Sequence, residues 1–539
     1  MSRSRRLPAL TAAILGACAL TACSGGGPAA EAGAPKLTTS VPAPTRAVDT
    51  VTWNLPTGEP ATLDPVLAAT ESGGTVIANM CEGLFTYGPD YEREPALATS
   101  VDHPDPLTYV LHLREGTKFW NGAPVTPEDV VYSVERVLDP AFGSSWIAWA
   151  QHLDRIEITG GHEITVRLKK PDALVPSYLA SPAFFVVQKE FAEKAGKSFG
   201  TARGGVMCTG PYRFGAWTQG QRISLTRNDA WWNTAVKPKV KNLEFGFIAD
   251  PAAQTAALAS GDVDGQFLVP TAARAQLAGT GHLLYGESLN TTFLSVLNRR
   301  GALADPAVRQ ALHALLPYEG IVESVYRGTA EPLRALVPPA AWGYAENTYE
   351  QAYERLPVPR QDLEKAKKLI AAAPDAEREI VLAYTTAIEE ETRIATAIAD
   401  TAGRAGLDIE LKPLTGEQFG AMFASPEARK GVDLFLSTGF LSFPEPLEYY
   451  AYFTTGHFYN FPGYRNEKYD AAIAEAQTTE DPAGRARLVT EAQAILARDM
   501  INLPLVSQYL SVYYGPELTG LAPRANYLYT PWATALGGE

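Results

Sequence analysis

The sequence predicts an α/β protein of two or three lobes, and three observations support this fold class. The chain has 539 residues, and roughly 490 of them follow an N-terminal leader and linker, which is more than one hydrophobic core usually supports. From residue 291 onward, apolar strands alternate with helices, the pattern of a parallel or mixed sheet covered on both faces. The preceding half is richer in strands of alternating polar and apolar residues.

The first half contains several strands and a hairpin. Residues 51–55 and 108–113 have the pattern of half-buried strands. Isoleucine and valine residues alternate on both sides of Gly160-Gly161, which predicts a hairpin with a two-residue turn over residues 156–168. Further strands are expected at residues 222–226 and 242–248, followed by a helix at 252–260.

One helix of this half has clear start signals. Thr126 is placed as its cap, Pro127 as its first residue, and Asp129 three residues after the cap. This order satisfies the free amide groups of a first turn. The buried stripe is expected to consist of Val130, Val131, Val134 and Val137.

The second half predicts a regular alternation of elements. Strands are expected at residues 292–298, 379–384, 407–412 and 432–437, and at 502–507 and 509–514 near the end. Helices are expected at residues 305–315, 361–373, 389–405, 416–424, 467–477 and 481–498. The glutamates at 389–391 are interpreted as a solvated first turn that the helix dipole favours.

The N-terminus has the pattern of a secretory signal peptide. Three arginines precede an apolar run over residues 7–20, and a run of about fourteen residues is shorter than the roughly 20 that a membrane-spanning helix needs. No later segment is apolar enough to span a membrane either. The sequence therefore predicts that residues 1–22 are removed on export.

The segment Leu20-Thr21-Ala22-Cys23 resembles the bacterial lipobox, which implies a lipid on Cys23. Cys18 fits the same pattern loosely, but cleavage there would leave apolar residues on the mature chain. Residues 24–47 are rich in Gly, Ala, Pro, Ser and Thr, the composition of a flexible tether. We therefore expect a lipidated tether over residues 23–48.

Charge and cysteine content bear on the possible partners of the protein and on its disulfide bonding. Acidic residues exceed basic ones by 60 to 46, giving a net charge of −14, without long runs of one sign, which argues against a nucleic-acid partner. Beyond the leader and Cys23, the cysteines are Cys81 and Cys208. The exterior is oxidising, so they form either one disulfide or two buried free thiols.

The motifs of common enzymes are incomplete in this sequence. Gly196-Lys197-Ser198 lacks the earlier glycine of a phosphate-binding loop, because Phe191 stands there. No His-Glu-x-x-His motif occurs. The seven histidines are scattered, whereas metal sites need ligands at compact spacing. We therefore expect no catalytic residues, no resident metal and no cofactor.

Several segments together resemble the family 5 extracellular solute-binding proteins, the peptide, opine and nickel class of bacterial ABC importers. In chain order, they are residues 57–65, 81–85, 111–130, 209–232, 260–264 and 298–312. The most specific is Leu111-His112-Leu113-Arg114-Glu115-Gly116 with the capped helix that follows. The resemblance extends from Val51 to the C-terminus, and the shared order of the segments carries it.

The resemblance implies a two-lobed periplasmic-binding-protein fold of type II, cluster C, with an extra subdomain in the first lobe. We expect the chain to cross between the lobes near Glu287 and Asn502. This gives a first lobe of residues 49–95, 205–286 and 502–539, an extra subdomain of residues 96–204, and a second lobe of residues 287–501. Closure of such lobes on a solute is a hinge motion that needs no reaction.

The resemblance also implies which residues contact the solute. In peptide-binding members, these are a glutamate of the opening segment, an aromatic residue after the first long helix, and a loop whose backbone pairs with the peptide. The matching positions are Glu59, Trp146, Gly439, Phe440, Leu441, Ser442 and Phe443. Without the resemblance, we would interpret Glu59 as an acidic residue of a turn, and Trp146 and Phe440 as aromatic residues of the core.

The main departure from the family pattern is at Ser442, where peptide binders carry an aspartate that pairs with the peptide's ammonium group. Loss of that charge should weaken recognition of a free N-terminus. Glu445 is the nearest acid, but Pro444 and Pro446 constrain its backbone. The solute could therefore be a peptide, a modified peptide, an oligosaccharide or a metal chelate.

The sequence thus predicts a monomeric lipoprotein outside the cytoplasmic membrane that captures a small solute for the permease subunits of an ABC importer. Two other classes remain open. An exported hydrolase would need a nucleophile and base that the sequence does not display. A surface lipoprotein for adhesion or signalling would have a collapsed or solvent-open cleft.

Overall fold

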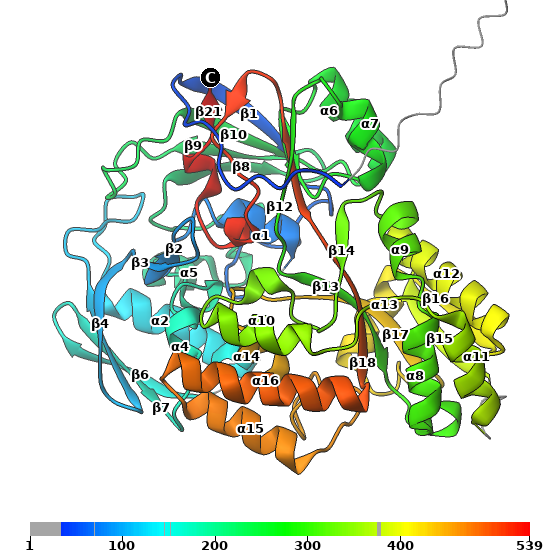
Figure 1. The fold of residues 1–539 in the computed structure, drawn as a ribbon. Coiled ribbons are helices and arrows are strands. Elements are labelled where there is room, and N and C mark those ends of the chain that lie inside the picture. The colour runs from blue at the N-terminus through cyan, green and yellow to red at the C-terminus, as the bar shows by residue number, and fades with distance from the viewer. Residues whose placement is uncertain (1–33, 69, 145, 151, 374–378) are drawn as a thin grey trace, which may run out of the picture. The chain divides into compact units, whose positions relative to one another are not determined.

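The computed structural model describes residues 34–539, apart from residues 69, 145, 151 and 374–378. The predicted signal peptide, Cys18, Cys23 and the first part of the predicted tether lie outside the described residues. Two large sheets and one smaller sheet organise the described chain (Figure 1). The predicted α/β class is confirmed.

The first lobe is built on a seven-stranded sheet. Its strands, in spatial order, are β12 (His282–Gly286), β19 (Leu510–Tyr514), β11 (Gly265–Phe267), β1 (Val48–Asn54), β10 (Val240–Gly246), β9 (Arg222–Arg227) and β8 (Tyr212–Thr218). β1 runs parallel to β10 and β11, and the other neighbours are antiparallel. Short pairs add β2 (Phe85–Tyr87) with β3 (Arg93–Pro95), and β20 (Leu518–Thr519) with β21 (Gly537–Gly538).

The second lobe is built on a six-stranded mixed sheet. Its spatial order is β14 (Ala330–Pro332), β18 (Asn502–Gln508), β13 (Asn290–Val296), β17 (Leu434–Phe440), β15 (Ile380–Thr385) and β16 (Ile409–Leu414). β15 pairs in parallel with β16 and β17, whereas β13 pairs antiparallel with β17 and β18. The sequence predicted a parallel or mixed sheet, and the structure shows that it is mixed.

Helices cover both faces of this second sheet. On one face, α8 (Pro306–Leu315), α11 (Leu363–Ala372) and α12 (Glu389–Ala405) share a core with Leu382, Leu434 and Leu436. On the other face, α13 (Gly416–Ala424) packs against Ala383 and Phe435. Successive residues of a strand point to opposite faces, so each strand serves both cores.

Most other helices are short or lie at the periphery. They are α1 (Glu71–Ile77), α6 (Pro251–Ser260), α7 (Arg274–Leu277), α9 (Tyr318–Gly320), α10 (Glu346–Glu354), α14 (Pro446–Ala451), α15 (Glu467–Thr478) and α16 (Pro482–Asp499). α15 and α16 lie side by side below α10 (Figure 1). The predicted helix at residues 252–260 corresponds to α6.

A four-stranded antiparallel sheet lies within residues 96–204, in the order β4 (Ala98–Asp105), β5 (Thr108–Leu113), β7 (Glu163–Leu168) and β6 (Leu153–Gly160). β6 and β7 form the predicted hairpin, with Gly160 paired to Glu163 across the turn. The same stretch contains α2 (Pro127–Leu138), α3 (Ile147–Ala150), α4 (Val175–Tyr178) and α5 (Lys189–Ala195). We call residues 96–204 the extra subdomain.

The capped helix of this subdomain, α2, starts as predicted. The Thr126 hydroxyl accepts from the Asp129 amide, and the Asp129 carboxylate accepts from the Thr126 amide. Three of the predicted stripe residues are buried, whereas Val131 is only partly covered. The same helix also buries Arg136, which pairs with Asp64 of the first lobe.

The chain passes between the two large sheets twice. The first passage falls between β12 and β13 and so includes the predicted position, Glu287. The second differs from the prediction, because β18 pairs with β13 and β14 of the second sheet, whereas β19 pairs with β11 and β12 of the first. The second passage is therefore at Tyr509 and not near Asn502.

Part of the predicted tether is bound to the first lobe. The Thr38 amide donates to the Tyr285 carbonyl oxygen at 2.7 Å, and Arg524 donates to the Thr39 carbonyl oxygen at 2.8 Å. Arg46 and Gly538 exchange backbone hydrogen bonds of 3.1 and 2.9 Å. We call residues 37–46 the strap, and its contacts shorten the segment that is available as a free tether.

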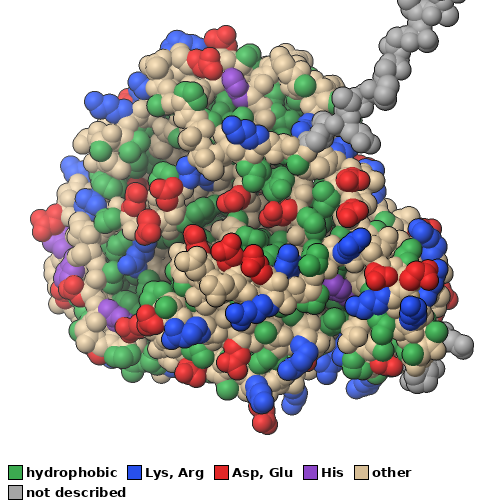
Figure 2. All heavy atoms as spheres, viewed as in Figure 1, with side chains coloured by type: hydrophobic (Ala, Val, Ile, Leu, Met, Phe, Trp, Pro, Cys, Tyr) green, Lys and Arg blue, Asp and Glu red, His purple; other side chains and the backbone are tan. Residues whose placement is uncertain are grey.

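The surface agrees with the dispersed charge of the sequence. On the face drawn in Figure 2, acidic and basic side chains are interspersed among apolar ones. Within residues 34–539, apart from the gaps named above, no helix combines the length and the apolar character required to cross a membrane.

Candidate functional site

A cavity of about 320 Å³ lies between the second sheet and the extra subdomain. Its base is formed by β13 and β17, whose antiparallel register sets Phe293 opposite Ser437 and Ser295 opposite Phe435. Because side chains alternate along a strand, these four residues face away from the core that contains α8 and α12. The regular strand geometry therefore places two aromatic rings and two hydroxyl groups on one surface.

The walls of this cavity are mainly aromatic. Besides the base residues, the lining consists of Trp146, Phe423, Thr438, Gly439, Phe440, Ser442, Tyr449, Tyr452, Phe453, Tyr459 and Phe461. None of the lining residues that the structure describes carries a charged side chain. The cavity thus offers apolar surface with a few hydroxyl groups, the usual character of a small-molecule site.

Four of the sequence-predicted site residues line this cavity. Trp146 approaches it from the extra subdomain, and its indole donates to the Pro65 carbonyl oxygen at 2.8 Å. Gly439, Phe440 and Ser442 approach it from the second lobe. A β-carbon at Gly439 would lie 2.0 Å from the Tyr449 hydroxyl oxygen, so only glycine leaves room for that tyrosine.

Two neighbours of these residues point into the protein. Leu441 is buried, and its amide donates to the Leu289 carbonyl oxygen at 3.1 Å. Phe443 is also buried and packs against the rings of Tyr87 and Tyr178, with centroids 6.3 and 5.6 Å away. Neither residue lines the cavity, because alternate side chains of an extended segment face opposite ways.

Glu59 lies apart from this cavity. Its carboxylate accepts from the Trp217 indole at 2.6 Å and from the Gly220 amide at 3.0 Å. These contacts tie the opening segment to the end of β8. The structure therefore does not bring Glu59 together with the other predicted site residues.

Glu445 is buried in a network of its own. Its carboxylate accepts from the Tyr344 hydroxyl at 2.7 Å and pairs with Arg485 at 3.4 Å. It also caps α14 by accepting from the Leu447 amide at 3.0 Å. Burial raises the pKa of Glu445, and Arg485 opposes that shift. Glu445 is thus occupied inside the second lobe and does not line the cavity.

Sequence reasoning missed a second buried acid, Glu448. Its carboxyl group accepts from the Ser442 amide at 3.2 Å and from the Tyr452 hydroxyl at 3.3 Å. Both partners line the cavity. Burial raises the pKa of Glu448 to about 8. Its position six residues after Ser442, in the first turn of α14, was the available signal.

The missed lining residues had weaker signals. Phe293 and Ser295 alternate within an expected strand, and their face cannot be known without the register of the sheet. The aromatic residues between 449 and 461 form a dense group in the sequence, but such groups are commonly core. Folding makes the site from these segments together with Trp146, which is distant in the sequence.

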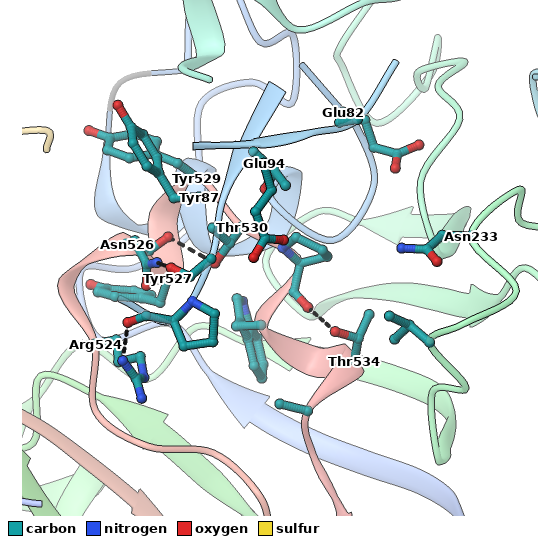
Figure 3. Close-up of a pocket in the computed structure, with 18 of the residues that line it drawn as sticks. Glu82, Tyr87, Glu94, Asn233, Arg524, Asn526, Tyr527, Tyr529, Thr530 and Thr534 are labelled. Carbon is teal, nitrogen blue, oxygen red and sulfur yellow. Dashed lines mark hydrogen bonds between the residues drawn. The ribbon is translucent and has the colours of Figure 1, made fainter. Parts of the chain in front are cut away.

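A second cavity, of about 480 Å³, is larger but lies in the first lobe (Figure 3). Tyr87 and Tyr529 lie at one end of it and Asn233 at the other, with Glu94 between them. Its lining comes from the strap, residues 81–96 and 231–236, and the C-terminal segment. The described lining residues of this cavity all belong to the first lobe, although Tyr87 also packs against Phe443 of the second lobe.

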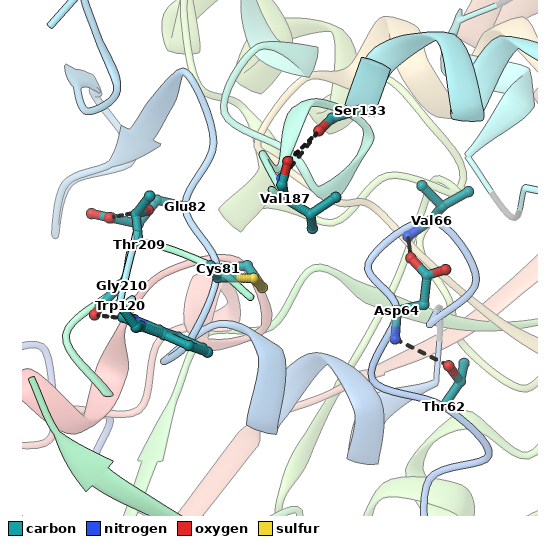
Figure 4. Close-up of a disulfide and its surroundings, with 11 residues drawn as sticks. Thr62, Asp64, Val66, Cys81, Glu82, Trp120, Ser133, Val187, Thr209 and Gly210 are labelled. Atoms are coloured by element: carbon teal, nitrogen blue, oxygen red, sulfur yellow. Dashed lines mark hydrogen bonds between the residues drawn. A yellow bond between two sulfur atoms is a disulfide. The ribbon is translucent and has the colours of Figure 1, made fainter. Parts of the chain in front are cut away.

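The structure joins Cys81 and Cys208 in a disulfide (Figure 4). The bond links the segment after α1 to the segment before β8. Nearby, the Thr209 hydroxyl donates to Glu82 at 2.6 Å, and the Trp120 indole donates to the Gly210 carbonyl oxygen at 3.1 Å. No group of three or more His, Cys, Asp or Glu side chains in the described part of the chain is arranged to hold a metal ion.

The fold and the cavity define a two-lobed solute-binding protein. The family description "Bacterial extracellular solute-binding proteins, family 5 Middle" matches residues 92–461. The chain belongs to this family, whose members serve ABC importers, and is a solute-binding protein and not an enzyme.

Relatives of known name agree with this assignment. The chain is 26% identical over 478 residues to the glutathione-binding protein GsiB of Salmonella typhi, covering 85% of this chain and 89% of the relative. It is 25% identical over 501 residues to the dipeptide-binding protein DppE of Bacillus subtilis, covering 88% and 90%. The structure of DppA from Helicobacter pylori, in complex with the peptide STSA, has a TM-score of 0.78 at 20% identity, covering 92% and 99%. That likeness confirms the two-lobed fold.

Proposed function

We propose that this protein captures a peptide or peptide-like solute outside the cytoplasmic membrane and delivers it to the permease of an ABC importer. The observation that carries the proposal is a strand edge beside the cavity. β17 pairs with β13 along its whole length, but with β15 only at Leu434 and Phe435. In the described chain, residues 436–440 therefore have no partner strand on the β15 side.

An extended peptide can add to such an edge as a further strand. Its backbone would bond to β17, while one of its side chains would enter the adjacent aromatic cavity. The names of GsiB and DppE support this solute class, because one binds glutathione and the other dipeptides. Trp146 of the extra subdomain lines the same cavity, so closure of the two lobes would enclose the solute.

We further propose that the protein is held at the outer face of the membrane by a lipid on Cys23, after removal of residues 1–22. The lipobox-like sequence and the tether composition of the residues that follow support this anchor. The division of the body into two lobes and an extra subdomain, with a passage at Tyr509, belongs to the same proposal.

The solute class is tested by mass spectrometry of whatever the natively purified protein releases on denaturation. We expect a peptide or peptide derivative. A sugar or a metal chelate would keep the capture role and change the solute class. No released solute, together with no thermal shift from a peptide library, would contradict solute capture.

The anchor is tested separately in cells. Radiolabelled palmitate should label the native protein and leave the Cys23→Ser variant unlabelled, and that variant should leave the membrane fraction. Cys18→Ser is the matched control, with unchanged labelling. Labelling that is lost only in Cys18→Ser would move the anchor to that residue.

A further inference from the structure

Glu448 is an acid buried without a basic partner. Only 2% of the residue is exposed, and its hydrogen-bond donors are the Ser442 amide and the Tyr452 hydroxyl. Among the described residues, no lysine, arginine or histidine forms an ion pair with it, since the nearby Arg485 pairs with Glu445. A buried carboxylate that lacks a cation is costly, and such groups concentrate at functional sites.

The position of this acid relates it to the cavity. Ser442 and Tyr452 both line the cavity and both hydrogen-bond to Glu448. The carboxyl group therefore lies one hydrogen bond behind the wall. A cation that entered the cavity beside Ser442 would supply the missing charge partner.

The rest of the cavity selects the other part of such a solute. Among the described residues, its lining contains ten aromatic residues, no charged side chain, and hydroxyl groups near the base. A volume of about 320 Å³ can accept a ring or a branched aliphatic group. A charged side chain placed there would lose its hydration without a partner.

We infer that the solute carries a protonated primary amine next to a bulky apolar group, with the amine at Ser442 and Glu448 and the apolar group in the aromatic cavity. For a peptide, this means a free N-terminus on a residue such as phenylalanine. The inference rests on the proposed solute capture and specifies its chemistry. Glu448, from α14, thereby supplies the charge that the chain lacks at position 442.

Calorimetric titration with four probes tests the inference: the tripeptides Phe-Ala-Ala, N-acetyl-Phe-Ala-Ala, Lys-Ala-Ala and Glu-Ala-Ala. We expect Phe-Ala-Ala to bind at least tenfold more tightly than each of the others. Glu448→Gln should weaken Phe-Ala-Ala to the level of its acetylated form and leave the acetylated form unchanged. Glu467→Gln, at an exposed site on α15, is the matched control and should change neither.

A rescue variant separates loss of charge from loss of folding. Ser442→Asp in the Glu448→Gln background places a carboxylate at the cavity wall again and should restore the preference for the free amine. Equal binding of Phe-Ala-Ala and its acetylated form to the native protein would overturn this inference and leave the proposed function standing. If no probe binds and the native protein releases no solute, the proposed function itself is overturned.

Proton release gives an independent readout. Below pH 8 the Glu448 carboxyl is largely protonated in the free protein, because burial raises its pKa to about 8. Binding an ammonium group should expel that proton, so Phe-Ala-Ala should bind more tightly as the pH rises from 6 to 7, by up to about tenfold. The α-amino group of the probe has a pKa of about 7.7–8.0, so the gain should level off as the pH approaches 8.

The other groups around Glu448 should not produce this pH dependence. The acid Glu445 is paired with Arg485, and Tyr452 contributes its hydroxyl as a donor. Burial raises the pKa of each remaining tyrosine nearby: Tyr87, Tyr178, Tyr449 and Tyr529. N-acetyl-Phe-Ala-Ala should bind without proton release, and a slope shared by both probes would contradict the role of Glu448.

Discussion

Asp64 and Arg136 form an ion pair that water scarcely reaches, because their side chains are 4% and 5% exposed. The guanidinium group also lies over the rings of Tyr132, Phe142 and Phe199. The pair joins the opening segment of the first lobe to α2 of the extra subdomain. Removal of one partner would leave the other charge buried and uncompensated.

We therefore expect Asp64→Asn to lower the free energy of unfolding by about 3–5 kcal/mol, measured by urea denaturation. The matched control is Asp49→Asn, which removes an exposed pair with Lys241 at 3.2 Å and should leave the urea midpoint unchanged. Equal losses of unfolding free energy in the two variants would contradict the expectation that the buried Asp64–Arg136 pair stabilises the protein more than the exposed pair does.

At the same scale, sequence reasoning found residue types but not their surroundings. The glutamates at 389–391 were expected to be solvated, but Glu391 is buried and accepts from the Thr385 amide at 3.2 Å. The first turn of α12 packs over the end of β15, so one of its three acids faces inward. Glu445 and Glu448 are likewise distinguished by the buried groups that they contact. The local sequence does not show these contacts.

At the scale of elements, periodicity predicted most helices and strands because each has its own pattern. α13 is predicted with its observed bounds, Gly416–Ala424, and β5 with its bounds, Thr108–Leu113. Pairing is different, since β18 and β19 form one nearly continuous apolar stretch separated only by Tyr509. Their assignment to different sheets depends on long-range partners and is absent from the local pattern.

The disulfide is also an element-scale feature, because it ties the segment after α1 to the segment before β8. On the chain-entropy model, closing the 127-residue separation stabilises the fold by roughly 5 kcal/mol. We expect the double variant Cys81→Ser, Cys208→Ser to unfold at a correspondingly lower urea concentration. The unreduced native protein should also resist alkylation of both cysteines in denaturant, whereas rapid labelling there would show free thiols.

At the scale of the whole molecule, the site depends on segments that are far apart in the sequence. Trp146, β13, β17 and α14 meet only after both lobes and the extra subdomain have folded. Sequence reasoning reached Trp146, Gly439, Phe440 and Ser442 through family resemblance, and not through a local motif. It could not find the base of the cavity, which requires the register of β13 against β17.

The strap acts at this largest scale, because it joins the N-terminal side of the body to a segment just before the first passage and to the C-terminal segment. It touches Tyr285 just before the first passage and Gly538 at the end of the chain. The Thr519 hydroxyl donates to the Pro42 carbonyl oxygen at 3.1 Å, and Arg46 pairs with Glu517 at 3.1 Å. These bonds connect parts of the first lobe that no single element spans.

We therefore expect a chain that starts at Ala47 to lose about 3–5 kcal/mol of unfolding free energy relative to one that starts at Ala34, since a net hydrogen bond contributes about 1 kcal/mol. Urea denaturation of the two purified proteins measures the difference. Binding of Phe-Ala-Ala to the shorter chain serves as the control that its cavity is intact. Equal urea midpoints would mean that the first lobe is complete without the strap, so that residues 37–46 act only as tether.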